Sequence, residues 1–363
     1  MKKVSMNLVC DLAPTKDNGR NGEGDFLRAP NGDILFAYSH YNTADGDDHA
    51  PCDIAMIRSC DEGNTWSEPV IIACSKKDFG TNNIMSVSAM PLLDGSPCFY
   101  FLIKENDHST SIGRTYSSDG LHFTAERCVR RFPHGYYTVN NARLERLSDG
   151  TIVAPASRHD ISSPADEQNN LFYFSEAATT FCLISRDDGK TFEDTPARVC
   201  IPANRQIDCL QEPGILELPG GVLWLWARSG LGYQTQCYSL DNMKHFTIPE
   251  PSGFTSPCSP MEVFSAGNGV LYTVYNPIPL YNGREINVSW GRTPLVIRKS
   301  TDWGKTWGDL HIIEDDPNRG YCYPAMFLTN DGHMLCAYCR GGEEDGCCLF
   351  RSGIAKIELA SIE

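Results

Sequence analysis

The chain has 363 residues, of which 31 are basic and 46 acidic, and its formal net charge is −15. This charge argues against nucleic acids and anionic membrane surfaces as partners. The length allows a large buried core. No run of about 18 apolar residues occurs, so we expect no membrane span. No apolar segment of signal-peptide length follows Lys2 and Lys3, which predicts a cytoplasmic protein.

The 16 cysteines also favour a reducing cytoplasm and free thiols, although a disulfide framework is an alternative. Cys336 and Cys339, followed by Cys347 and Cys348, have a spacing seen at some zinc sites. In a strand, Cys336 and Cys339 would point to opposite faces, so we expect no metal.

Six segments in chain order predict β-hairpins, because each contains an apolar run, a turn and a second apolar run. They are LRAPNGDILFAY (27–38), AMPLLDGSPCFYFL (89–102), LERLSDGTIVAPA (144–156), ILELPGGVLWLWA (215–227), VFSAGNGVLYTVY (263–275) and AMFLTNDGHMLCAY (325–338). Helical periodicity is nearly absent.

A short Asp-containing repeat follows all but the last hairpin. Its copies are SCDEGNTW (59–66), SSDGLHF (117–123), SRDDGKTF (185–192), SLDNMKHF (239–246) and STDWGKTW (300–307). Asp and Gly suit a tight turn, and the final aromatic anchors that turn to the sheet. We expect these turns to be structural and not to contact a ligand.

Six such units of four short strands predict an all-β fold, a six-bladed β-propeller that forms one domain over residues 1–363. The sixth unit lacks an Asp-type turn and ends in LFRSGIAKIELASIE (349–363). We expect the N-terminal VSMNLVC (4–10) to complete this last blade, which would close the ring.

The segment 210–228 places Glu212 before one apolar run and Arg228 at the end of its partner. Burying this pair is costly, so it indicates an ion pair or a polar site. Matched positions in the other hairpins also carry polar residues, which predicts a shared pocket on the propeller axis. These positions are Glu23, Ser86, Asn140 and Asn141, Ser259 with Pro260, and Tyr323.

The Asp repeat on six hairpins resembles the sialidase superfamily, exo-acting neuraminidases with an Asp-box (BNR-repeat) propeller, over essentially the whole chain. The resemblance implies a tyrosine nucleophile assisted by a glutamate, an aspartate acid/base and three arginines on the substrate carboxylate. A tyrosine nucleophile is a recognised exception to the two-carboxylate scheme of glycosidases. A neutral phenol suits an anionic substrate, which would repel a carboxylate nucleophile. No metal or organic cofactor is implied.

By this resemblance, Glu212 matches the assisting glutamate and Arg228 the second arginine. Tyr323 lies in the place of the nucleophile, with Tyr321 as a competitor. Arg292 resembles the third arginine, and Arg298 is its alternative.

For the acid/base, the loop TADGDDHAPCDIAMIRS offers four aspartates. The family's spacing favours Asp48, with Asp47 as second choice. The remaining two are Asp45 and Asp53.

The first hairpin departs from the family. Arg28-Ala-Pro30 looks like the family's arginine signature, but it lies too close to its turn, and Glu23 stands where the first arginine belongs. Either Arg20 replaces that cation or the carboxylate clamp is incomplete. Asn141 and its neighbours depart too, in place of a glycine-rich segment. Other residues that could shape a different sugar pocket are Arg143, His159 and Trp290.

The hypothesis that follows is an exo-sialidase-type glycoside hydrolase that releases a terminal acidic sugar from a glycan or glycoconjugate, with net retention. Tyr323, Glu212 and Asp48 would be catalytic, and Arg228 with Arg292 would hold the carboxylate. Alternatives are a related propeller glycosidase or lyase on another sugar and a non-catalytic carbohydrate-binding propeller.

Overall fold

The computed structural model describes residues 1–166, 171–175, 177–201, 209–280 and 288–362. Strands dominate these residues, as the sequence predicts. The longest helix described, α1 (Ser75–Phe79), has five residues, so none of the described helices could cross a membrane. Two short 3₁₀ turns lie at Glu343–Asp345 and Leu359–Ser361.

The N-terminal half forms three hydrogen-bonded sheets. An eight-stranded sheet contains β3 (Asn21–Arg28), β4 (Ile34–Tyr41), β5 (Cys52–Ser59), β6 (Val70–Ala73), β7 (Asn83–Ala89), β8 (Cys98–Asn106), β9 (Ser109–Tyr116) and β10 (Thr124–Arg127). A six-stranded sheet contains β11 (Val129–Arg131), β12 (Tyr136–Thr138), β13 (Glu145–Arg146), β14 (Ile152–His159), β17 (Thr179–Ser185) and β18 (Thr191–Asp194). A two-stranded sheet pairs β15 (Ile161–Asp166) with β16 (Leu171–Phe174).

The C-terminal half forms three more sheets. The first contains β19 (Cys209–Leu218), β20 (Val222–Ser229), β21 (Tyr233–Ser239) and β22 (Glu250–Thr255). The second contains β1 (Lys2–Lys3), β23 (Glu262–Gly267), β24 (Val270–Tyr275), β25 (Leu295–Ser300) and β26 (His311–Glu314). The third contains β2 (Met6–Leu12), β27 (Cys322–Leu328), β28 (His333–Cys339) and β29 (Ser352–Glu358).

All six predicted hairpins are confirmed as antiparallel pairs. They are β3–β4, β7–β8, β13–β14, β19–β20, β23–β24 and β27–β28. The prediction for the N-terminus is also confirmed, because β2 pairs with β29 in the last sheet.

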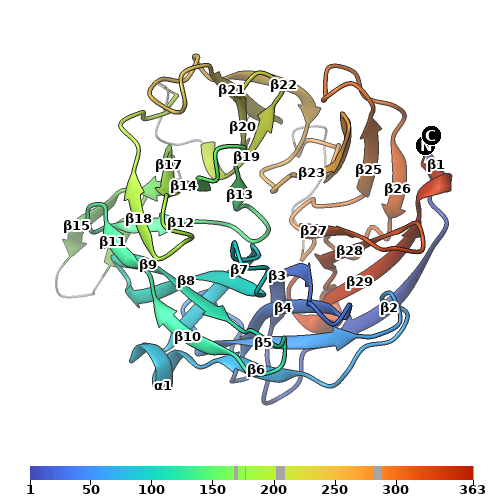
Figure 1. The fold of residues 1–363 in the computed structure, drawn as a ribbon, viewed down its shortest axis with the longest axis horizontal. Coiled ribbons are helices and arrows are strands. Elements are labelled where there is room, and N and C mark those ends of the chain that lie inside the picture. The colour runs from blue at the N-terminus through green and yellow to red at the C-terminus, as the bar shows by residue number, and fades with distance from the viewer. Residues whose placement is uncertain (167–170, 176, 202–208, 281–287, 363) are drawn as a thin grey trace.

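The sheets form a propeller-like ring, with β3, β7, β13, β19, β23 and β27 around its centre (Figure 1). The hydrogen-bonded sheets do not divide into the six separate four-stranded blades that we expected. A single parallel pairing, Cys52 with Asn83, joins β5 to β7 and merges the first two units. The six-stranded sheet gains β11 and β12 beyond β13, β14, β17 and β18, and the sheet of β23–β26 gains β1.

The Asp repeats form the predicted turns through local hydrogen bonds. Ser59 Oγ donates to Asp61 Oδ1 at 2.8 Å and accepts the N–H of Gly63 at 2.8 Å, while Thr65 N–H donates to Asp61 Oδ1 at 2.9 Å. The copies that begin at Ser185 and Ser300 repeat these bonds. All partners lie within six residues, so the turn depends little on its surroundings.

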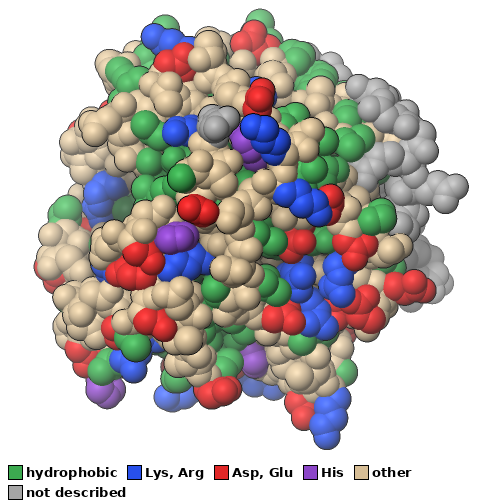
Figure 2. Space-filling view, turned by 90° about the vertical axis from the view of Figure 1, so that its right-hand side faces the viewer, with side chains coloured by type: hydrophobic (Ala, Val, Ile, Leu, Met, Phe, Trp, Pro, Cys, Tyr) green, Lys and Arg blue, Asp and Glu red, His purple; other side chains and the backbone are tan. Residues whose placement is uncertain are grey.

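The apolar core lies between neighbouring sheets. Phe26 and Phe36 of the first sheet pack in one cluster with Leu335 of the last, and Trp224 packs with Leu271 of the next sheet along the chain. These sheets therefore bury apolar faces against their neighbours, which an isolated four-stranded sheet could not do. On the side of the ring that carries β25 and β26, charged side chains of both signs are interspersed (Figure 2).

Candidate active site

Four of the innermost strands bulge at the positions that the hairpin pattern singles out. The pairing register shifts between Gly22 and Asp25, Met85 and Ser88, Gln211 and Gly214, and Cys322 and Ala325. Within each bulge one residue has a left-handed backbone: Glu23 (φ 55°), Ser86 (φ 62°), Glu212 (φ 48°) and Tyr323 (φ 54°). Bulges re-aim side chains at functional sites, and left-handed non-glycine residues concentrate there.

The remaining two hairpins follow this rule less closely. In the third, the left-handed residue is Ala142, one position after Asn141. In the fifth, neither Ser259 nor Pro260 has a positive φ. The match between sequence position and bulge therefore covers four units directly.

Tyr323 and Glu212 meet across the ring. The Tyr323 hydroxyl donates a hydrogen bond to Glu212 Oε1 at 2.9 Å. Burial and the Glu212 charge raise the pKa of Tyr323 well above its usual value, although Arg228 and Arg292 oppose this. The phenol is therefore held neutral, with a carboxylate acceptor already in place.

Arg228 completes this group from the end of β20. Its Nη1 lies 3.0 Å from Glu212 Oε2 and 3.5 Å from the Tyr323 hydroxyl. Its Nε also donates to Gln211 Oε1 at 3.1 Å. The Arg228 and Glu212 side chains are 13% and 12% exposed, so a ligand can reach a pair that is otherwise enclosed.

Arg292 lies over the Tyr323 ring, with its guanidinium carbon 5.7 Å from the ring centre. Its Nη1 donates to Cys322 Sγ at 3.3 Å and its Nη2 to the Cys258 carbonyl at 3.2 Å. The guanidinium also stacks on Trp290, 5.0 Å away, which is 39% exposed. Among the described residues, Arg292 has no carboxylate partner.

Arg20 and Glu23 form a second, deeper ion pair. Arg20 Nη2 lies 2.5 Å from Glu23 Oε1, and Arg20 Nη1 lies 2.5 Å from Asp48 Oδ1. Arg20 is 2% exposed. Ser86 Oγ donates to the other Glu23 oxygen. Arg20 is therefore neutralised by two carboxylates and does not offer a free cation to a ligand.

The two carboxylates on Arg20 have opposite pKa shifts. Burial raises the pKa of Glu23, and Arg20 offsets this only in part. Desolvation opposes ionisation of Asp48 too, but Arg20 and Lys104 outweigh it and hold its pKa well below the usual range. Asp48 is therefore held ionised, which is the form of a base and not of an acid.

Of the four loop aspartates, only Asp48 contacts Arg20 in the described structure. Asp45 and Asp47 accept backbone N–H groups within their own loop, and Asp53 accepts the N–H of Ser75 at 2.6 Å. Sequence analysis missed Lys104, whose Nζ donates to the Asp48 carbonyl at 2.5 Å. The available signal was a lysine that directly follows the apolar run 98–103 within β8.

Asn141 lies behind the site. It is fully buried, and its Nδ2 donates to the carbonyls of Gly24 at 3.0 Å and Tyr323 at 3.3 Å. This corrects the expectation that Asn141 contacts substrate, because the side chain is closed to ligands and supports the backbone of two bulges. Arg143 pairs with Glu262 in the same buried layer.

The competing residues lie elsewhere. Tyr321 is fully buried in an apolar cluster, with its ring 6.1 Å from Tyr338. Arg298 donates to the carbonyls of Gly308 and Trp307 in an Asp turn. Arg28 pairs with Glu62 at 2.8 Å, so the signature-like arginine is structural.

His159 and the closely spaced cysteines are the next candidates. His159 is buried, and its Nδ1 lies 3.0 Å from the Ser175 carbonyl. Cys336 and Cys339 belong to different core clusters, which confirms that they point apart. Every cysteine whose side chain the structure describes is a free thiol.

Comparison with known proteins supports the fold. The BNR repeat-like domain family matches residues 26–336. No curated protein matches.

Three solved structures are similar over nearly the whole chain, and at these identities they show the fold alone. A protein of unknown function from Dyadobacter fermentans is 17% identical, with 97% of this chain and 99% of that one covered and a TM-score of 0.68. The Hadza microbial sialidase Hz136 is 14% identical (95% and 66% covered, TM-score 0.70). The NanB sialidase from Streptococcus pneumoniae is 12% identical (99% and 71% covered, TM-score 0.69).

Proposed function

The chain belongs to the BNR repeat-like domain family, and from that premise we propose that it is a glycoside hydrolase of the sialidase type with Tyr323 as nucleophile. The observation that carries the proposal is the 2.9 Å hydrogen bond from the Tyr323 hydroxyl to Glu212. A neutral phenol is a weak nucleophile until a neighbouring base removes its proton. Glu212 is in the position of that base.

In the proposed first step, Tyr323 Oη attacks the anomeric carbon while Glu212 accepts the phenolic proton. The bond to the leaving-group oxygen breaks, and a glycosyl-tyrosine forms. In the second step water attacks the same carbon, Asp48 takes a proton from the water, and the bond from that carbon to Tyr323 Oη breaks. Glu212 returns the phenolic proton to Tyr323, and the sugar leaves with net retention. Arg228 holds the Glu212 carboxylate in place through their 3.0 Å ion pair.

Asp48 is the proposed base that activates water. Because Arg20 and Lys104 hold its pKa low, Asp48 is ionised at neutral pH and has no proton to donate, although the same shift makes it a weak base. We therefore expect aryl glycosides, whose leaving groups depart without protonation, to be cleaved faster than alkyl glycosides.

A terminal acidic sugar is the proposed substrate, with its carboxylate against Arg292 and Arg228. Arg292 supports this choice because no described carboxylate neutralises it. Trp290, stacked on Arg292 and 39% exposed, offers an apolar surface for the sugar ring beside that cation.

A glycosidase or lyase that acts on another sugar is the second candidate. The observation that favours it is the Arg20–Glu23 pair, because Glu23 occupies the place of the first clamp arginine and Arg20 is neutralised. Only Arg228 and Arg292 then remain for a carboxylate. A non-catalytic carbohydrate-binding propeller is the third.

We also propose that the ring has six structural units. The eight-stranded sheet splits into β3–β6 and β7–β10 at its single parallel pairing. In support, residues on or next to β3, β7, β13, β19, β23 and β27 line one cavity of about 320 Å³.

The decisive experiment is covalent trapping. The protein is incubated with 2,3-difluorosialic acid and with the matching difluoro derivatives of neutral sugars, and the adduct is located by peptide mass spectrometry. We expect an adduct on Tyr323 that disappears in Tyr323→Phe and persists in Tyr321→Phe. The identity of the trapping sugar separates the first candidate from the second. No adduct and no turnover of aryl glycosides would leave the non-catalytic alternative.

A further inference from the structure

A second pocket lies away from the proposed catalytic residues, between the sheet of β19–β22 and the sheet of β23–β26. Its volume is about 540 Å³, which is within the range of small-molecule sites. Leu218, the last residue of β19, lines this pocket, whereas Glu212 lies near the start of that strand. At about 3.3 Å per residue, the two ends are roughly 20 Å apart.

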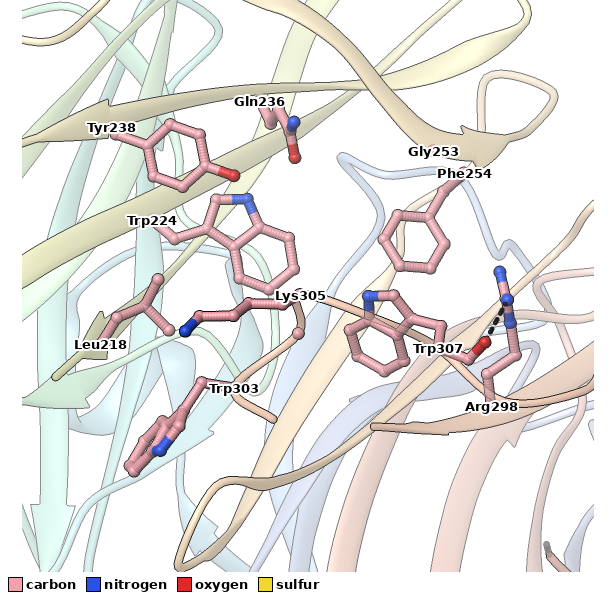
Figure 3. Close-up of a pocket in the computed structure, with 11 residues that line it drawn as sticks. Leu218, Trp224, Gln236, Tyr238, Gly253, Phe254, Arg298, Trp303, Lys305 and Trp307 are labelled. Atoms are coloured by element: carbon pink, nitrogen blue, oxygen red, sulfur yellow. Dashed lines mark hydrogen bonds between the residues drawn. The ribbon is translucent and has the colours of Figure 1, made fainter. Parts of the chain in front are cut away.

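Aromatic rings from both sheets face this pocket. Trp224 and Tyr238 come from β20 and β21, and Phe254 comes from β22 (Figure 3). Trp303 and Trp307 come from the fifth Asp turn. The Phe254 and Trp307 rings pack edge to face with centres 5.2 Å apart. Trp303 and Trp307 are only half-buried, so part of each indole remains available to a ligand.

The fifth Asp turn differs from two others in the chain at the position of Trp303. The matching residues are Glu62 in the first turn and Asp188 in the third, and all three have left-handed backbones with φ of 57°, 59° and 64°. Glu62 accepts the backbone N–H of Asn330, and Asp188 accepts that of Leu93. Each acid thus bonds the hairpin turn of the preceding unit.

In the fifth unit Trp303 takes the place of the acid, so the acid's bond to the preceding unit is missing. The pocket lies beside the hairpin turn of that preceding unit, at Leu218. A tryptophan in a left-handed conformation is strained, because its bulky side chain lacks the local hydrogen bonding of Asn or Asp. The Trp303 N–H donates to the Gly269 carbonyl at 3.0 Å, so this backbone conformation anchors the turn to the hairpin of its own unit. The indole itself lines the pocket, where part of it remains available to a ligand.

Polar groups complete the lining. Trp224 is 4% exposed and its Nε1 has no hydrogen-bond partner, although the ring lies against the pocket on the side of Gln236 and Tyr238 (Figure 3). Lys305 is exposed at the rim. A buried donor without a partner is costly, and a ligand acceptor would satisfy it.

We infer that this pocket is a second carbohydrate-binding site, which holds a pyranose ring of a glycan against Trp303 and Trp307. The apolar C–H face of a pyranose stacks on flat indoles, and its hydroxyls match the donors of Gln236, Lys305 and Trp224. Leu218 is the one aliphatic side chain among the described lining residues, so the pocket suits a sugar better than a lipid or an apolar peptide. The inference goes beyond the proposed function and does not require catalysis.

The test is titration of the full chain with the methyl glycosides of galactose, mannose, N-acetylglucosamine and N-acetylneuraminic acid, by calorimetry and by tryptophan fluorescence. We expect saturable binding of at least one probe. Trp303→Asn removes the ring and suits the left-handed backbone, so it should fold while weakening binding by about tenfold or more. Lys305→Ala should weaken binding several-fold.

Asp188→Asn is the matched control, because it changes the same turn position in another unit and should bind as the wild type does. The inference is overturned if no probe binds, or if Trp303→Asn and Asp188→Asn bind equally. Hydrolysis of a small aryl glycoside should be unchanged in Trp303→Asn. Binding that depends on Trp303 in a protein without hydrolase activity would refute the proposed function alone.

Discussion

The hydroxyl of Tyr323 and the carboxylate of Glu212 lie 2.9 Å apart, although 111 positions separate the two residues in the chain. Each residue sits in a bulge of an innermost strand and has a left-handed backbone. The pair is therefore held by two independent departures from regular strand geometry. Such departures persist only where the surrounding structure stabilises them.

Replacing Tyr323 by Phe should abolish turnover with little effect on folding. The variant removes the attacking oxygen but keeps the ring, so we expect kcat on an aryl sialoside to fall by about 10³-fold or more. One lost hydrogen bond should lower the free energy of unfolding by about 1 kcal/mol. Tyr321→Phe is the matched control. Wild-type rates in Tyr323→Phe would contradict the assignment of the nucleophile.

Replacing Arg292 by Ala should distinguish the acidic from the neutral sugar. If Arg292 holds a carboxylate, KM for an aryl sialoside should rise by about tenfold or more, because a charged hydrogen bond is lost. KM for neutral aryl glycosides should hardly change. Arg292→Lys, which keeps the charge, should recover part of the affinity for the sialoside. An equal effect on both substrates would indicate a structural role.

Replacing Arg28 by Ala should affect stability and not activity. Arg28 and Glu62 are 25% and 26% exposed, and the pair also holds Asn330 of the last hairpin. We expect the free energy of unfolding to fall by about 1 kcal/mol, measured by denaturant titration. Loss of hydrolysis at full stability would mean that Arg28 is the missing clamp cation after all.

Asp25 should make stability depend on pH. Burial raises its pKa to about 7, although the N–H groups of Ala89 and Phe26 oppose the shift. The folded state therefore holds the proton more tightly than the unfolded state. Its contribution is fully present below about pH 4 and is lost as pH rises through about 7, with a slope of up to roughly 1.4 kcal/mol per pH unit.

The measurement compares denaturant unfolding of the wild type and Asp25→Asn between pH 4 and pH 8. The variant should show a flatter dependence in this window, whereas the exposed control Asp17→Asn should follow the wild type. Identical slopes in the wild type and Asp25→Asn would show that Asp25 does not carry the effect.

The parts of the fold that could be predicted from sequence are those that depend on neighbours in the chain. The bonds among Ser59, Asp61 and Thr65 span at most a few residues, so the repeat pattern identifies each Asp turn. Hairpins are equally local, which is why all six were found. The same hairpin pattern aligns Glu212 with Tyr323, although it does not show that their side chains meet.

Tertiary structure decided what the aligned residues do. The hairpin pattern puts Glu23 at the position of the family's first arginine, with Arg20 three residues earlier. Only tertiary packing joins Arg20 to Asp48 and leaves Arg20 2% exposed. Asn141 looked like a ligand contact and instead bonds the backbone of Tyr323, 182 residues away. The pairing of Cys52 with Asn83, which merges two predicted blades, follows no local pattern. Turns and hairpins depend on residues that are neighbours in the chain, whereas charge pairing and burial depend on which distant segments the ring brings together.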